Sequence, residues 1–196
     1  MAIVAALVAV AAVLPIAYLT TRHSGRTGGV TNALVVSGFA LPGLVIALAV
    51  TYWLLRAPLG SGLYQTFPPL IFAYVVHFGA QALRSSQVAV SGIPARVDDA
   101  ARSLGAGRWR RLRTVDVPLM LPGLAAAAGL VLLSTMKELP ATLLLAPTGF
   151  DTLATRIWSA TESGSFGRAG MASLILVALS GVLTWFLTIR RMERVA

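Results

Sequence analysis

Long apolar runs separated by short polar segments make up most of the chain. Each of five runs is long enough to cross the hydrocarbon core of a bilayer, which is about 30 Å thick. They lie at 2–19, 32–55, 69–83, 119–137 and 169–189. Because a chain in lipid must pair its backbone groups internally, this pattern predicts an all-α fold, a polytopic transmembrane helical bundle of about five spans. We expect residues 1–196 to form a single transmembrane domain.

The basic residues predict how the spans are oriented. Arg22 and Arg26 lie in segment 20–31, seven arginines lie in loop 84–118, and three more follow residue 189. Since loops rich in arginine stay in the cytoplasm, we predict that loops 20–31 and 84–118 and the C-terminus are cytoplasmic. The amino terminus then lies outside with no charged flank, which suggests the carboxy-terminal part of a longer membrane protein. The first run has no basic n-region and no cleavage site, so we interpret it as a span and not as a signal peptide.

The composition excludes several classes of protein. Hydrophobic residues make up 57% of the chain and charged residues 12%, with a mean hydropathy of +0.79, which is too apolar for the surface of a water-soluble fold. The net charge of +9 comes from residues between the runs, so we expect contact with membrane lipid and no nucleic-acid partner. Lys137 is the single lysine and no Walker A phosphate loop is present, so any ATP must be bound by a partner. Without cysteine, the chain has no disulfides and no thiolate metal site.

A few residues inside the runs are unusual for a membrane helix. His77 and Gln81 are polar, and because they are four residues apart they share one helix face. Facing lipid would be costly, so we expect them to face the interior of the bundle, where packing and contact with a transported substrate are both open interpretations. The tripeptide Leu41-Pro42-Gly43 allows a kink or a close helix approach in the second run.

Lys137, Glu138 and Pro140 lie at the outer end of the fourth run and are candidates for a gate or a substrate pathway. An intramembrane enzyme would need paired carboxylates, a Ser-His set or a metal cluster at membrane depth. Lys137 and Glu138 are adjacent and point in different directions, which makes them a poor catalytic pair. We therefore expect no catalytic and no metal-ligating residues. A secondary transporter would show inverted repeats and ion-coupling charges, and the sequence has neither.

The loop 84–118 contains the signals of a short helix. Pro94 suits a first helical turn, acidic residues at 98 and 99 suit the positive end of the helix dipole, and Gly105 suits a left-handed stop. These signals predict a helix over 94–104. It is too short to be stable alone in water, so we expect neighbouring segments or a docking partner to hold it. The cluster Arg108-Trp109-Arg110-Arg111 that follows is typical of an interfacial anchor.

The same loop carries a resemblance to a known family. The pattern Asp99-Ala100-Ala101-x-x-x-Gly105-Ala106, followed by Val115-Asp116-Val117-Pro118, resembles the EAA loop of ABC importer permeases of the type I class. It departs from the family pattern at Asp99, where glutamate is usual. A second stretch, 136–158, resembles the ferric-iron branch of that family.

The resemblance implies a multi-pass permease of the cell inner membrane that works by alternating access and holds no cofactor itself. Its implied partners are ABC ATPase subunits that bind ATP, an external substrate-binding protein, and a second permease half or homodimer partner. In the family the loop forms a coupling helix that docks on the ATPase. The residues that this assigns to ATPase coupling are Asp98, Asp99, Ala100, Ala101, Gly105 and Ala106.

The substrate that the resemblance implies is ferric iron. The residues themselves show no iron site, because the chain offers no cysteine cluster, no His pair and no carboxylate cage. Permeases of the same family for thiamine, sulfate, phosphonate or polyamine are therefore alternatives.

Overall fold

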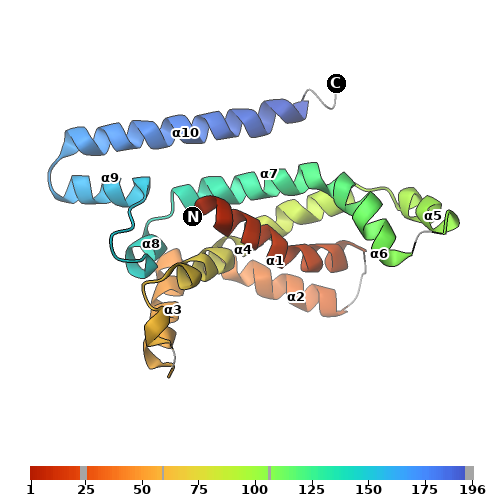
Figure 1. Cartoon of the computed structure of the whole chain (residues 1–196), viewed down its shortest axis with the longest axis horizontal. Coiled ribbons are helices and arrows are strands. Elements are labelled where there is room, and N and C mark those ends of the chain that lie inside the picture. The colour runs from red at the N-terminus through yellow and green to blue at the C-terminus, as the bar shows by residue number, and fades with distance from the viewer. Residues whose placement is uncertain (23–25, 59, 106, 193–196) are drawn as a thin grey trace.

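The computed structural model describes residues 1–22, 26–58, 60–105 and 107–192, and the elements in these residues are helices, with no strand among them. The predicted all-α fold is confirmed. The α-helices, shown in Figure 1, are α1 (Ala2–Arg22), α2 (Arg26–Ser37), α3 (Gly43–Arg56), α4 (Phe67–Ser91), α5 (Ala95–Ser103), α6 (Arg108–Arg111), α7 (Val117–Met136), α8 (Pro140–Leu145), α9 (Leu153–Glu162) and α10 (Phe166–Met192). Short 3₁₀ turns cover Gly38–Ala40 and Ser61–Leu63, and a π-helical turn, η3, covers Leu112–Asp116.

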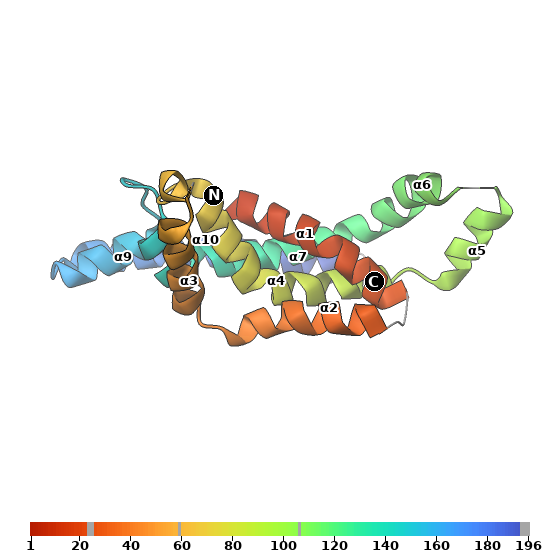
Figure 2. The same cartoon turned by 90° about the horizontal axis from the view of Figure 1, so that it is seen from below.

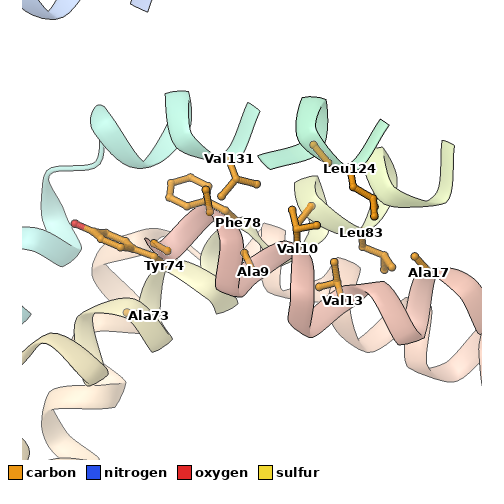
Figure 3. Packing of buried hydrophobic residues seen from close by; sticks show 14 of the residues in the cluster. Ala9, Val10, Val13, Ala17, Ala73, Tyr74, Phe78, Leu83, Leu124 and Val131 are labelled. Atoms are coloured by element: carbon orange, nitrogen blue, oxygen red, sulfur yellow. The ribbon is translucent and has the colours of Figure 1, made fainter. Parts of the chain in front are cut away.

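Helices α1, α4 and α7 form the centre of the bundle (Figure 3). Ala5 and Ala9 of α1 are almost completely buried, and such small side chains let neighbouring helices approach closely. Leu83 of α4 is fully buried in the same cluster. At Gly123 of α7 an added Cβ would lie 2.5 Å from the Cβ of Ala89 on α4. The contact between α4 and α7 therefore depends on a glycine at this position.

Three of the described helical segments are long and apolar enough to cross a membrane: Ala2–Arg22, Trp109–Met136 and Phe166–Leu187. They coincide with the first, fourth and fifth predicted spans. The third predicted span, 69–83, lies inside the longer α4, where residues such as His77 and Gln81 make the helix more polar. Although more polar, α4 contributes more of the buried core than α10 does, since it packs against both α1 and α7.

The second predicted span differs from the expectation of one helix over 32–55. The segments Gly28–Ala40 and Gly43–Arg56 meet at an angle of 103° and could form one span only as a broken one. The break falls at Leu41 and Pro42, which have extended backbone conformations. Pro42 has no N–H to donate and disfavours a helical conformation at Leu41 before it, so the helix ends there and a new one starts.

Helices α9 and α10 lie side by side and apart from the centre of the bundle (Figure 1). Helix α9 begins with a capping box, in which the Thr152 hydroxyl accepts from the Thr155 N–H at 3.1 Å and the Thr155 hydroxyl accepts from the Thr152 N–H at 2.8 Å. In α10, most side chains of the apolar stretch are not buried within the chain, and Ser180 is an exception. Lipid or another protein chain must therefore cover α10 in a membrane.

Candidate functional site

The helix predicted over 94–104 is present as α5, within one residue of its predicted bounds. The Leu104 N–H donates to the Ala100 carbonyl at 3.1 Å and completes its last turn. Gly105 follows with a φ of +74°, in the left-handed region that favours glycine. The left-handed stop predicted at Gly105 is thereby confirmed. An added Cβ at Gly105 would meet no atom within 4 Å, so the glycine is required by its backbone conformation and not by lack of space.

The two sides of α5 differ in exposure. Ala101 is buried and Val97 packs against the hydrophobic core, whereas Asp99 and Ala100 face outward. Leu104 shares the helical spacing of Val97 and Ala101 but is 86% exposed, so it does not pack with them. The side chain of Asp98 and all of Ala106 lie outside the described residues. Helices α5 and α6 project beyond the end of the bundle (Figure 2), which leaves the outward side of α5 open to a partner.

A buried polar cluster lies where this projecting loop joins the bundle. Asp116, the last residue of η3, is completely buried, and its Oδ2 accepts a hydrogen bond from the Tyr18 hydroxyl at 3.2 Å. The same oxygen lies 3.4 Å from Nε of Arg111, and Nη2 of Arg111 donates to the Tyr18 hydroxyl at 3.0 Å. We call these three residues the Tyr18–Arg111–Asp116 cluster. The sequence marked Asp116 only as a letter of the loop motif, since nothing in it pairs residues 18 and 116.

The polar residues predicted within the spans meet across α4 and α7. His77 Nε2 lies 3.9 Å from Glu138 Oε2, and the Ser134 hydroxyl donates to Gln81 Oε1 at 2.9 Å. His77 and Gln81 are four residues apart on α4, whereas Ser134 lies in the last turn of α7 and Glu138 two residues beyond its end. The two contacts therefore lie one above the other along antiparallel segments. Both side chains thus have polar protein partners, in line with the expectation that they face the bundle. The hydrogen bond from Ser134 to Gln81 could not be predicted from the sequence, because serine is common at helix contacts and nothing marks this one as a partner of Gln81.

The Glu138 carboxylate lies against α8, His77 of α4 and the first residue of α3. Its Oε1 accepts from the Ala141 N–H at 3.1 Å in the first turn of α8, which starts at Pro140. An added Cβ at Gly43, the first residue of α3, would lie 2.8 Å from that oxygen and 3.4 Å from His77 Nε2. Lys137 is exposed while Glu138 is partly buried, as expected for adjacent residues that point in different directions. The break between α2 and α3 therefore brings the start of α3 against this carboxylate.

The arrangement places hydrogen-bonding groups and a carboxylate beside an open pocket. His77, Gln81 and Ser134 line an open pocket of ≈ 530 Å³ together with Arg84. Among the described residues, no group of three or more His, Asp or Glu side chains could hold a metal ion. Two sites thus stand out: an exposed helix with a buried ionic anchor at its base, and a polar contact between α3, α4 and α7.

The long apolar helices define the chain as a multi-pass membrane protein. Residues 5–193 match the family described as the binding-protein-dependent transport system inner membrane component, and the chain belongs to that family. It is 33% identical over 182 residues to the Fe(3+)-transport system permease protein FbpB 2 of Haemophilus influenzae, a match that covers 93% of this chain and 36% of the relative. It is 30% identical over 157 residues to the putative 2-aminoethylphosphonate transport system permease protein PhnV of Salmonella typhimurium, covering 80% of this chain and 57% of that protein.

The fold is also similar to a solved structure. A chain of the MetNI methionine ABC transporter, in an inward-facing conformation, superposes with a TM-score of 0.74 at 19% identity. The superposition covers 100% of the present chain and 90% of the MetNI chain. At this identity the likeness concerns the fold alone. The present chain spans 36% of FbpB 2 and 57% of PhnV. The predicted family membership and the multi-pass membrane fold are confirmed.

Proposed function

We propose that this chain is the membrane-spanning permease subunit of an ATP-binding-cassette importer. Substrate arrives on an external binding protein, and a separate ATPase subunit drives the alternating access of the permease. The observation that carries this proposal is α5, a short exposed helix that ends at a left-handed Gly105. An exposed helix of 9 residues has little stability of its own, so we expect a docked partner to stabilise it.

Within this proposal Asp99 and Ala100 contact the ATPase directly. Both are exposed, and the small alanine side chain allows a partner to approach closely. Asp98, Ala101, Gly105 and Ala106 belong to the same coupling segment, with Gly105 setting where the helix ends. The coupling segment, loop 20–31 and the C-terminus then face the cytoplasm, in keeping with the arginine distribution.

The substrate pathway in this proposal follows the polar face of α4 and the outer end of α7. His77, Gln81 and Glu138 lie there, with Pro140 and the exposed Lys137 at the mouth. Polar side chains at membrane depth need protein or water beside them, and the open pocket at His77 and Gln81 provides room for a solute. A second permease half or a second copy of this chain completes the pathway on the open side.

Ferric iron is the cargo that we propose first, because the relative named for Fe(3+) transport matches 93% of this chain. A phosphonate is the alternative, supported by PhnV. For iron, we place the selection of the cargo in the external binding protein, since the described residues contain no group of three or more metal ligands.

The experiment is co-purification followed by uptake. The chain is expressed with a candidate ABC ATPase and binding protein from the same organism, solubilised in mild detergent, and tested for a retained ATPase. Reconstituted vesicles are then offered radioactive iron or 2-aminoethylphosphonate with ATP inside or outside. ATP-dependent import of iron is the expected result. Import of the phosphonate alone would replace the cargo, and a chain that retains no ATPase would overturn the importer proposal.

A further inference from the structure

The Tyr18–Arg111–Asp116 cluster is the buried ionic contact at the base of the projecting loop. Asp116 is completely buried and the side chain of Arg111 is 12% exposed, so both ionised groups lie away from water. Burying two charged groups of this kind costs free energy, and removing one of them strongly destabilises the fold because the other charge stays buried. Its persistence at this position calls for a role besides general stability.

The cluster depends on the π-helical turn between its two charged members. Arg111 and Asp116 are five residues apart, and in an α-helix that spacing would place their side chains about 140° apart around the axis. The wider π turn over Leu112–Asp116 instead brings Nε of Arg111 to 3.4 Å from Oδ2 of Asp116. Single π turns are rare and occur frequently at functional sites. The ion pair and the π turn therefore stabilise one another.

The third member links this turn to a different helix. Tyr18 lies near the end of α1, and its hydroxyl donates to Asp116 and accepts from Arg111. Helix α1 packs along both α4 and α7 in the centre of the bundle. The cluster thus joins the projecting α5–α6 segment, through η3, both to the start of α7 and to α1. A displacement of α5 that is passed on through α6 to η3 must bend this turn, break the cluster, or move α1 with α7.

We infer that the Tyr18–Arg111–Asp116 cluster is the joint through which movement of the coupling helix reaches the spans, with Tyr18 and Asp116 as positioning residues. The inference rests on the proposed function and deepens it. In this role the cluster keeps η3 and α1 together, so a push on α5 moves helices and is not absorbed by the turn. When the cluster is disrupted, the ATPase remains docked and hydrolyses ATP, but less substrate is imported for each ATP hydrolysed.

The test is the amount of substrate imported per ATP hydrolysed, measured in vesicles that contain the full chain, its ATPase and the binding protein. Asp116→Asn keeps the shape of the side chain and removes its charge, and Tyr18→Phe removes only the hydroxyl. The matched controls are Asp151→Asn and Tyr52→Phe, which make the same chemical changes at exposed positions.

Asp116→Asn should lower import per ATP by about tenfold, because it removes the buried charge that lies 3.4 Å from Nε of Arg111. Tyr18→Phe should lower it by about fivefold or more, because it removes both hydrogen bonds of the Tyr18 hydroxyl, each worth about 1 kcal/mol, which corresponds to about fivefold. Both variants should retain the ATPase, and both controls should match wild type. If Asp116→Asn fails to insert, Tyr18→Phe alone decides. An unchanged ratio in Tyr18→Phe, or a loss of import that only follows a loss of bound ATPase, would overturn the inference. A wild-type chain that binds no ATPase would instead overturn the proposed function and the inference with it.

Discussion

Replacing Gly105 by valine tests the coupling helix most directly. The backbone at Gly105 has a φ of +74°, and nothing lies within 4 Å of an added Cβ, so the only obstacle to a side chain is conformational. A left-handed conformation costs an L-residue about 1–2 kcal/mol, and a β-branched residue tolerates it least. An energy of that size changes a conformational equilibrium by a factor of about 5–30.

This strain should fall on the end of α5 and not on the spans. The hydrophobic core that joins α1, α4 and α7 does not include Gly105, so the membrane level of Gly105→Val should stay near that of wild type. Uptake should fall by about fivefold or more, because the coupling segment would adopt its docking conformation that much less often. The assay pairs a blot of membrane fractions with co-purification of the ATPase and uptake of labelled substrate in the same cells.

Two controls separate the conformational effect from other causes. Gly164 also has a positive φ, +70°, and open space around an added Cβ, but it lies between α9 and α10. Gly164→Val therefore introduces the same strain away from the loop and should leave ATPase binding intact. Gly105→Asn should behave nearly as wild type, because asparagine visits the left-handed region readily. If Gly105→Val binds its ATPase and transports like wild type, α5 is only a connector and the reasoning fails.

Three further substitutions test other parts of the structure. Gly123→Ala places a Cβ 2.5 Å from the Cβ of Ala89 and should destabilise the fold by about 1–3 kcal/mol, seen as a lower unfolding temperature in detergent. Gly43→Ala places a Cβ 2.8 Å from Glu138 Oε1, so it should displace that carboxylate and reduce uptake while ATPase binding stays constant. Ser103→Cys introduces the chain's first cysteine at an exposed site of α5, and an impermeant thiol reagent should label it only after cells are permeabilised. Labelling in intact cells would reverse the proposed orientation.

Local signals made the coupling loop the most predictable part of the molecule. A proline, early acidic residues and a glycine each act on the backbone within a few residues, so they predicted both the bounds of α5 and the left-handed Gly105 without any tertiary contact. Hydrophobicity predicted the first, fourth and last spans for a similar reason, since length and composition decide whether a helix can cross a bilayer.

Contacts between distant parts of the chain could not be predicted in the same way. The tripeptide Leu41-Pro42-Gly43 indicated a kink or a close approach, but a bend of 103° depends on the packing of α3 against α4 and α8. His77 was expected to face protein, yet its neighbour Glu138 belongs to a helix end 61 positions further along, as the sequence numbering shows. The link from Tyr18 to Asp116 spans 98 positions. The pattern of apolar residues within one helix does not indicate which residue of a distant helix it will contact.

Burial divides the loop motif into two physically different parts. Asp99, Ala100 and Gly105 are exposed, and they depend little on the rest of this chain. Asp116, later in the same motif, is completely buried and holds Arg111 and Tyr18. A substitution at Asp99 therefore changes what the loop offers to a partner, whereas one at Asp116 changes how the loop is joined to its own bundle. The motif runs from α5 through its left-handed stop and the π turn into α7, so under the proposed function a partner's contact at one end and the buried cluster at the other are both needed.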